Sequence, residues 1–141
     1  MAYFPAIRSD VSGSDVLGTS GSPITIPTTY TGSVLSSTRD YSDCVWHVTL
    51  ASTGSGVTQI DVKVEWSEDG TNLSQQGSES ITAGTSTLSK YEGQYDVSGE
   101  TTQPFNLPAI SLPVAGPNAK ISIKAVGAAD GTCYIRVWRK A

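Results

Sequence analysis

The strongest constraint in this sequence is residues 60–66, where apolar and charged side chains alternate without an error. Successive side chains of an extended chain point to opposite faces, so such a segment has one apolar face and one charged face. The two sets are Ile60, Val62, Val64 and Trp66, and Asp61, Lys63 and Glu65. The pattern predicts an antiparallel strand with one buried face. Asp69-Gly70 then favours a tight turn, followed by a return strand over residues 73–76.

Other segments have the same two-residue rhythm, and none longer than about ten residues has helical periodicity without a Gly or Pro. Alternation predicts a strand over residues 44–50 and an edge strand, interrupted by prolines, over residues 105–114. Residues 121–126 and 133–138 flank Asp130-Gly131, which predicts a second hairpin. We therefore expect an all-β fold, an antiparallel β-sandwich with a jelly-roll-like arrangement of about seven or eight strands.

The chain of 141 residues is long enough for one domain with a real core. Residues 24–141 are predicted to form this single sandwich. Residues 1–23 combine apolar side chains with Gly and Ser, and are interpreted either as a frayed end or as an extended N-terminal arm that orders against a partner. The apolar side chains of this arm are Tyr3, Phe4 and Ile7.

The composition excludes several classes of partner. Charged residues make up 16% of the chain, against roughly 25% in an average domain, and the net charge of −4 includes no basic run. We therefore expect no nucleic-acid partner. No segment is long and apolar enough to suggest a signal peptide or a membrane span, so no membrane association is expected. Cys44 and Cys133 lie in strand-like segments and are interpreted as buried thiols rather than as a disulfide.

The residues that often carry chemistry do not form a recognisable constellation. His47 is the only histidine and sits in mid-strand, which predicts a half-exposed sheet residue rather than a zinc ligand. No nucleophile elbow or Ser–His–Asp arrangement is present. Asp61 and Glu65 beside Lys63 are interpreted as solubilising charges that face solvent. The sequence therefore predicts no catalytic residues, no metal and no cofactor, and a protein that is not an enzyme.

One strand face stands out as a candidate binding surface. If Ile135 and Val137 face the core, the alternation turns Tyr134, Arg136 and Trp138 to the opposite side. These three residue types are enriched at the energetic centres of protein interfaces. Two interpretations remain open: the face is covered by another part of the same chain, or it contacts another subunit.

Two segments resemble virion proteins of tailed bacteriophages. Residues 62–72 resemble a recurrent hairpin of these proteins in which a strand ends in a Ser-x-Asp-Gly-Thr-Asn turn, although Leu73 stands where the family usually has Trp. Residues 121–126 and 134–139 are similar to their closing hairpin. The resemblance implies a small β-sandwich that serves as a capsid decoration protein, a neck or tail accessory protein, or a fibre-associated domain.

The leading hypothesis is a non-enzymatic virion structural protein, a capsid decoration (cement) protein that binds and stabilises the major-capsid lattice. It implies assembly into the virion in a host cytoplasm and a homo-oligomer, with a trimer favoured. Its partner-binding residues would be Tyr3, Phe4 and Ile7 in the arm, and Tyr134, Arg136 and Trp138 on the last strand. The alternatives are a phage neck or tail accessory protein, and a carbohydrate-binding β-sandwich module that stacks a sugar ring on Tyr91, Tyr95 or Trp138.

Overall fold

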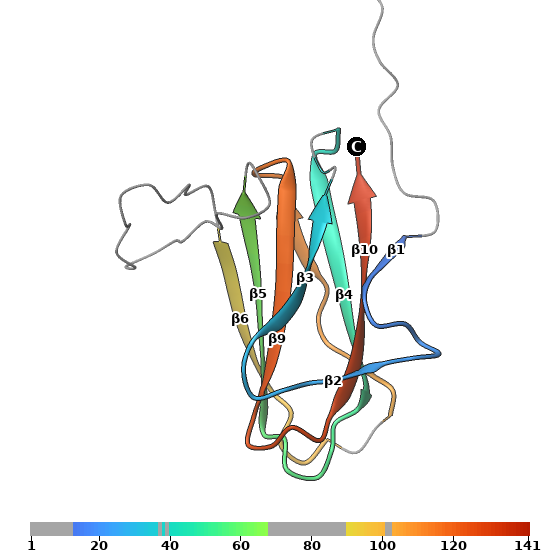
Figure 1. The fold of residues 1–141 in the computed structure, drawn as a ribbon, viewed down its shortest axis with the longest axis vertical. Coiled ribbons are helices and arrows are strands. Elements are labelled where there is room, and N and C mark those ends of the chain that lie inside the picture. The colour runs from blue at the N-terminus through green and yellow to red at the C-terminus, as the bar shows by residue number, and fades with distance from the viewer. Residues whose placement is uncertain (1–12, 37, 39, 68–89, 101–102) are drawn as a thin grey trace, which may run out of the picture.

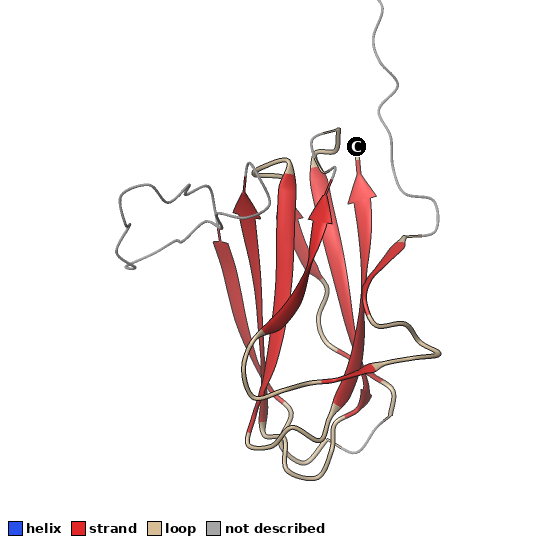
Figure 2. Cartoon of the chain, in the orientation of Figure 1, coloured by secondary structure: helices blue, strands red, loops and turns tan. Residues whose placement is uncertain are grey.

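The computed structural model describes residues 13–36, 38, 40–67, 90–100 and 103–141. Within these ranges the chain forms ten β-strands and no helix (Figures 1 and 2). The strands are β1 (Ser14–Leu17), β2 (Ile24–Thr25), β3 (Thr31–Ser36), β4 (Asp43–Ser52), β5 (Gln59–Ser67), β6 (Lys90–Asp96), β7 (Phe105–Asn106), β8 (Ile110–Pro113), β9 (Asn118–Val126) and β10 (Thr132–Lys140). All their pairings are antiparallel.

The strands form two sheets that pack against each other. The six-stranded sheet has the order β1-β10-β4-β7, with β2 also paired to β10 and β8 also paired to β4; the four-stranded sheet has the order β3-β9-β5-β6. The prediction of an antiparallel β-sandwich is therefore confirmed, while the jelly-roll arrangement stays a prediction. Ser14–Leu17, within the expected N-terminal arm, pairs with β10 in the six-stranded sheet. Residues 1–12 of that arm lie outside the described residues.

Strand β5 occupies the position that its alternating sequence predicts. Its apolar side chains are at most 1% exposed: Ile60, Val62, Val64 and Trp66. The strand lies between β9 and β6, and its return partner is β6, with Val62 opposite Gly93. The turn at Asp69-Gly70 and the return strand expected over residues 73–76 fall outside the described residues.

The predicted hairpin of the last two strands is wrong. Strand β9 pairs with β3 and β5 in one sheet, whereas β10 pairs with β1, β2 and β4 in the other. Residues 127–131 therefore cross between the sheets. The positive φ in this connection is at Gly127 (+105°) rather than at the expected Asp-Gly turn. Alternation along a strand specifies which face is buried but not which strand lies beside it, so the local signal was misleading.

The side chain of Asp130 ties this crossing to the connection between β4 and β5. Its carboxylate accepts hydrogen bonds from the Ser55 N–H (3.1 Å), the Ser55 hydroxyl (3.1 Å) and the Gly56 N–H (3.2 Å). Desolvation raises the pKa of this carboxyl, but the hydrogen bonds from Gly56 and Ser55 outweigh it and hold the pKa below its ordinary value. Asp130 thus stabilises two inter-sheet connections at one end of the sandwich.

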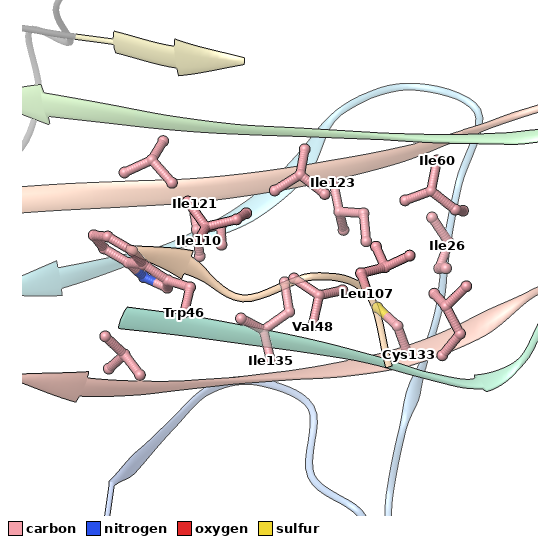
Figure 3. Close-up of a cluster of buried hydrophobic side chains, with 14 of the residues drawn as sticks. Ile26, Trp46, Val48, Ile60, Leu107, Ile110, Ile121, Ile123, Cys133 and Ile135 are labelled. Atoms are coloured by element: carbon pink, nitrogen blue, oxygen red, sulfur yellow. The ribbon is translucent and has the colours of Figure 1, made fainter. Parts of the chain in front are cut away.

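The core lies between the sheets and includes side chains from both (Figure 3). Trp46 of β4 meets Trp66 of β5 edge to face, with ring centroids 5.8 Å apart and an interplanar angle of 71°. Such a pair stabilises a core beyond the area it buries. The two indoles therefore join the six-stranded sheet to the four-stranded sheet.

Both cysteines are buried thiols outside any disulfide, as predicted. They lie on the paired strands β4 and β10, but the register places Cys44 opposite Arg139 and Cys133 opposite Leu50. They are therefore near opposite ends of the pair. Burial raises the pKa of the Cys133 thiol to about 12.

The edge-strand prediction for residues 105–114 is confirmed, with the strand split in two. Strands β7 and β8 both pair with β4, and residues 107–109, which include Pro108, separate them. Proline has no N–H to donate to the ladder, which explains the break. The split leaves β4 without a continuous neighbour on that side.

Candidate functional site

The alternation along β10 is the one the sequence predicts. Ile135 and Val137 are fully buried in the core, whereas Tyr134, Arg136 and Trp138 lie on the outer side of the six-stranded sheet and are partly exposed. We call the outer surface of β10 and its neighbours β1 and β4 the β10 face. It contains all three of the described residues that were predicted to bind a partner.

Sheet order places two further polar side chains beside Arg136. Asp15 of β1 is opposite Arg136 on one side, and His47 of β4 is opposite it on the other. The Arg136 Nε lies 3.2 Å from the Asp15 Oδ1, and both side chains remain substantially exposed, at 40% and 50%. His47 is exposed, as predicted. Asp15, Arg136 and His47 therefore form a polar row across three strands.

Tyr134 has a polar neighbour on β4. It lies opposite Thr49, whose hydroxyl donates a 2.8 Å hydrogen bond to the Asn106 side-chain oxygen. This bond orients Thr49 at the junction with β7. Together with the row at Arg136, it makes the middle of the β10 face polar.

Part of the Trp138 indole is covered by the chain as it enters β1. A Cβ atom built on Gly13 would lie 2.9 Å from the Trp138 Cε2, and Gly13 has a φ of +74°. Only glycine adopts this conformation at no cost while allowing so close an approach. The face was expected to be covered either by another part of the same chain or by another subunit. For part of Trp138, the cover comes from the chain itself.

The β10 face is hollowed into an open groove of about 500 Å³. Its walls and floor include Asp15, His47, Thr49 and the three β10 side chains, and Thr19 and Ser20 complete it from the connection between β1 and β2. Reciprocal backbone hydrogen bonds of 3.1 Å between Thr19 and Ser22 shape that connection. The volume falls within the range of small-ligand sites, and the lining is more polar than is usual for them.

Tyr91 and Tyr95, the other rings considered as a stacking platform, lie elsewhere. They are opposite Val64 and Ile60 of β5 and pack against the core. Their hydroxyl oxygens are 3.1 Å apart. Burial and the Tyr91 hydroxyl raise the pKa of Tyr95 to about 12. Of the three rings, only Trp138 is on the β10 face.

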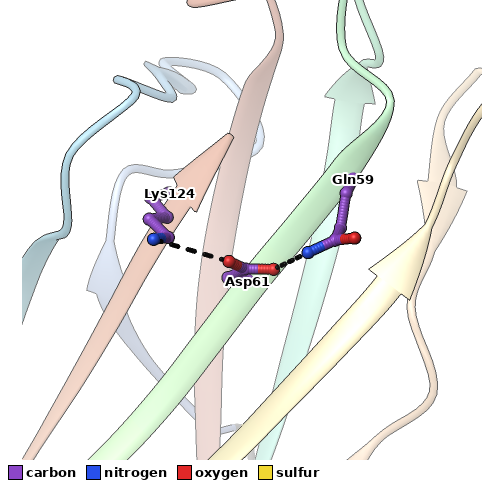
Figure 4. Close-up of polar contacts among 3 residues, drawn as sticks. All are labelled: Gln59, Asp61 and Lys124. Carbon is purple, nitrogen blue, oxygen red and sulfur yellow. Dashed lines mark hydrogen bonds and ion pairs between the residues drawn. The ribbon is translucent and has the colours of Figure 1, made fainter. Parts of the chain in front are cut away.

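The charged face of β5 differs from its prediction. Asp61 and Glu65 were expected to face solvent, but their side chains are only 7% and 8% exposed. The Asp61 carboxylate accepts a 2.6 Å hydrogen bond from the Gln59 side-chain amide and lies 3.6 Å from the Lys124 Nζ (Figure 4). Glu65 Oε1 is 3.2 Å from the Lys63 Nζ. We call these five residues the β5 charge network.

Tyr30 lies over this network. Its ring centroid is 4.4 Å from the Lys63 Nζ and 4.8 Å from the Lys124 Nζ, both within cation–π distance. The prediction that Asp61 and Glu65 face solvent was wrong because β5 is a central strand. Long side chains from β9 and from alternate positions of β5 surround the two carboxylates. The network is internally paired, which is the arrangement that buried charges need.

Other expected features can be placed in the described part of the chain. There, no three His, Cys, Asp or Glu side chains gather as a metal site would require. The same residues include no helix with the length and apolarity to cross a membrane. Tyr3, Phe4 and Ile7, predicted to bind a partner, lie outside the described residues. Comparison of the chain with protein-family models and with curated proteins gives no match.

Proposed function

We propose that the protein is a non-enzymatic structural component of a tailed-bacteriophage virion, and specifically a capsid decoration protein that binds and stabilises the major-capsid lattice. The observation that carries the proposal is the β10 face, where Tyr134, Arg136 and Trp138 are partly exposed on one strand. Side chains of these types supply much of the binding energy at protein interfaces. The sequence resemblance over β5 and over β9 and β10 directs the proposal to phage particles.

In this proposal the protein acts in the virion as a homo-oligomer, with a trimer as the favoured form. Closed symmetric contacts let a small sandwich match a symmetric lattice, and docking adds stability that the isolated subunit lacks. Tyr3, Phe4 and Ile7 make one contact with the neighbouring subunit or the lattice. The β10 face makes the second.

The test is co-sedimentation of the purified chain with capsids stripped of it and, separately, with purified tails. Saturable binding to capsids supports the proposal. Binding to tails alone replaces it with the neck or tail accessory function, and binding to neither particle overturns both. Deletion of residues 1–10 and Trp138→Ala should each reduce capsid occupancy. Tyr30→Ala, which removes an aromatic ring from the opposite face, is the matched control and should leave occupancy unchanged.

Carbohydrate binding is the second candidate function, because the β10 face is hollow. A flat subunit contact does not require a groove, whereas a small polar ligand does. The rings and hydroxyl groups that line the groove are of the types that contact sugars.

A further inference from the structure

We infer that the groove of the β10 face binds an uncharged saccharide, with a sugar ring against Trp138 or Tyr134 and its hydroxyl groups bonded by the Asp15–Arg136 pair. The inference rests on the second candidate function and names its site and its class of ligand. It does not depend on lattice binding, because the groove is complete within one chain.

The two aromatic rings set the direction of the ligand. Tyr134 and Trp138 are four residues apart on one strand and share its outer face. At about 3.3 Å per residue, their backbone positions are about 13 Å apart. The two rings therefore lie at separate positions along β10, with Arg136 between them. Sugar rings have apolar C–H faces that pack on aromatic side chains, so this spacing fits a saccharide chain better than a compact ligand.

The polar groups between the rings match hydroxyl groups. Each sugar hydroxyl donates one hydrogen bond and accepts others, so a site needs donors and acceptors side by side. The Asp15 carboxylate accepts and the Arg136 guanidinium donates, and their 3.2 Å contact places the two groups side by side. Their exposure of 50% and 40% leaves both open to a ligand. The exposed side chain of His47 extends this polar strip onto β4.

Charge selects against acidic ligands. The groove lining has one carboxylate and one guanidinium, which are paired. A ligand carboxylate or phosphate that approached Arg136 would meet Asp15 at close range, and like charges repel. The groove therefore favours neutral sugars over uronic acids, sialic acids and sugar phosphates.

The first experiment applies the full chain to a printed array of neutral and acidic glycans, followed by titration of the bound glycans in solution. Trp46 and Trp66 are 0% and 1% exposed, so Trp138 is the solvent-accessible indole and its fluorescence reports on the groove. We expect neutral glycans to bind and to shift this emission. Their acidic counterparts should bind at least about tenfold more weakly. An array without a bound glycan, or equal binding of acidic and neutral glycans, overturns the inference.

Variants then locate the site and test its charge rule. Trp138→Ala and Arg136→Ala should each weaken binding by about tenfold or more, with folding checked by circular dichroism. Tyr30→Ala on the opposite face should leave affinity unchanged. Asp15→Asn should narrow the preference for neutral glycans, because it removes the repelling carboxylate but keeps the shape of the groove. Binding that survives both Trp138→Ala and Arg136→Ala contradicts the inference. Capsid co-sedimentation of the same preparations tests the proposed lattice binding separately, so a failure of that function is distinguished from a failure of glycan binding.

Discussion

The two outer faces of the sandwich each contain an aspartate that faces a basic side chain on the next strand, and the two aspartates are opposites in exposure. In the β5 charge network, Asp61 and Lys124 are 3.6 Å apart and the carboxylate is 7% exposed. On the β10 face, Asp15 and Arg136 are closer, at 3.2 Å, yet they are 50% and 40% exposed. The Asp61 carboxylate is enclosed by other side chains while its partner Lys124 is 32% exposed, whereas both members of the second pair are exposed and line a groove.

The length of the flanking strands explains this difference. Strand β5 is paired along its length with β9, of nine residues, and with β6, of seven. Beside β10 and β4, the outer strands are short: β1 has four residues and an irregular register between Asp15 and Leu17, and β7 has two. Short edge strands leave part of the face without neighbouring side chains. The groove therefore forms where the flanking strands are short, and the charge network forms where they are long.

The largest expected effect is on the network. Asp61→Ala removes a buried carboxylate that is the acceptor for the Gln59 amide and the partner of Lys124. We expect the free energy of unfolding to fall by about 2–3 kcal/mol, because polar groups in a buried network would lose their partner. Urea denaturation monitored by tryptophan fluorescence measures this change.

The control for Asp61→Ala is Gln94→Ala. Gln94 lies opposite Asp61 on β6 and is exposed, so its loss should change the free energy of unfolding by less than about 0.5 kcal/mol. If Asp61→Ala were as mild as this control, the network would be an ordinary set of surface charges. The contrast between the two faces would then fail.

The second effect concerns the cover of Trp138. Gly13 and Gly99 have the same φ of +74°, but only Gly13 is near a side chain that an added Cβ would meet. Gly99→Ala should cost about 1 kcal/mol for the left-handed backbone, and Gly13→Ala about 1 kcal/mol more for contact with the indole. Urea denaturation gives both values. A shift of Trp138 emission in Gly13→Ala alone would confirm the contact, and equal costs would show that Gly13 does not restrict the ring.

The strands and their buried faces could be predicted because alternation is a local property. The apolar sides of β4, β5 and β10 followed directly from residues 44–50, 60–66 and 133–138. The neighbours of each strand did not, since alternation contains no information about pairing. The error at Asp130-Gly131 is the clearest case: a turn signal between two alternating segments fits a hairpin and an inter-sheet crossing equally well.

The same limit applies to the candidate site. Tyr134, Arg136 and Trp138 share one strand, so their common face was visible in the sequence. Asp15 and His47 join them only because β1 and β4 lie on either side of β10. The outward direction of His47 was predictable, but its proximity to Arg136 was not. Exposure was misjudged for Asp61 and Glu65 for a related reason: it depends on what the neighbouring strands contribute.

A smaller effect is expected for Tyr30, which lies over two cations of the network. Tyr30→Ala removes both cation–π contacts from a ring that is 37% exposed. We expect a loss of about 1 kcal/mol in the free energy of unfolding, since each exposed contact of this kind contributes about 0.5–1 kcal/mol. Tyr30→Trp should retain most of this stability in the same urea titration. A Trp variant as unstable as Tyr30→Ala would show that the lysines gain nothing from the ring.

The smallest effect is expected for the ion pair of the β10 face. A double-mutant cycle with Asp15→Ala and Arg136→Ala should give a coupling energy of no more than about 0.5 kcal/mol, because water screens exposed pairs and ordering two side chains costs entropy. In molar salt this coupling should vanish, whereas a matching cycle on Asp61 and Lys124 should keep more of its value, since salt screens a pair less when one of its charges is buried. A strong, salt-resistant coupling between Asp15 and Arg136 would mean that the pair serves the fold. A weak coupling would mean that the Asp15–Arg136 contact contributes little to stability although it is shorter than the Asp61–Lys124 contact. This is expected of side chains that remain available to a ligand.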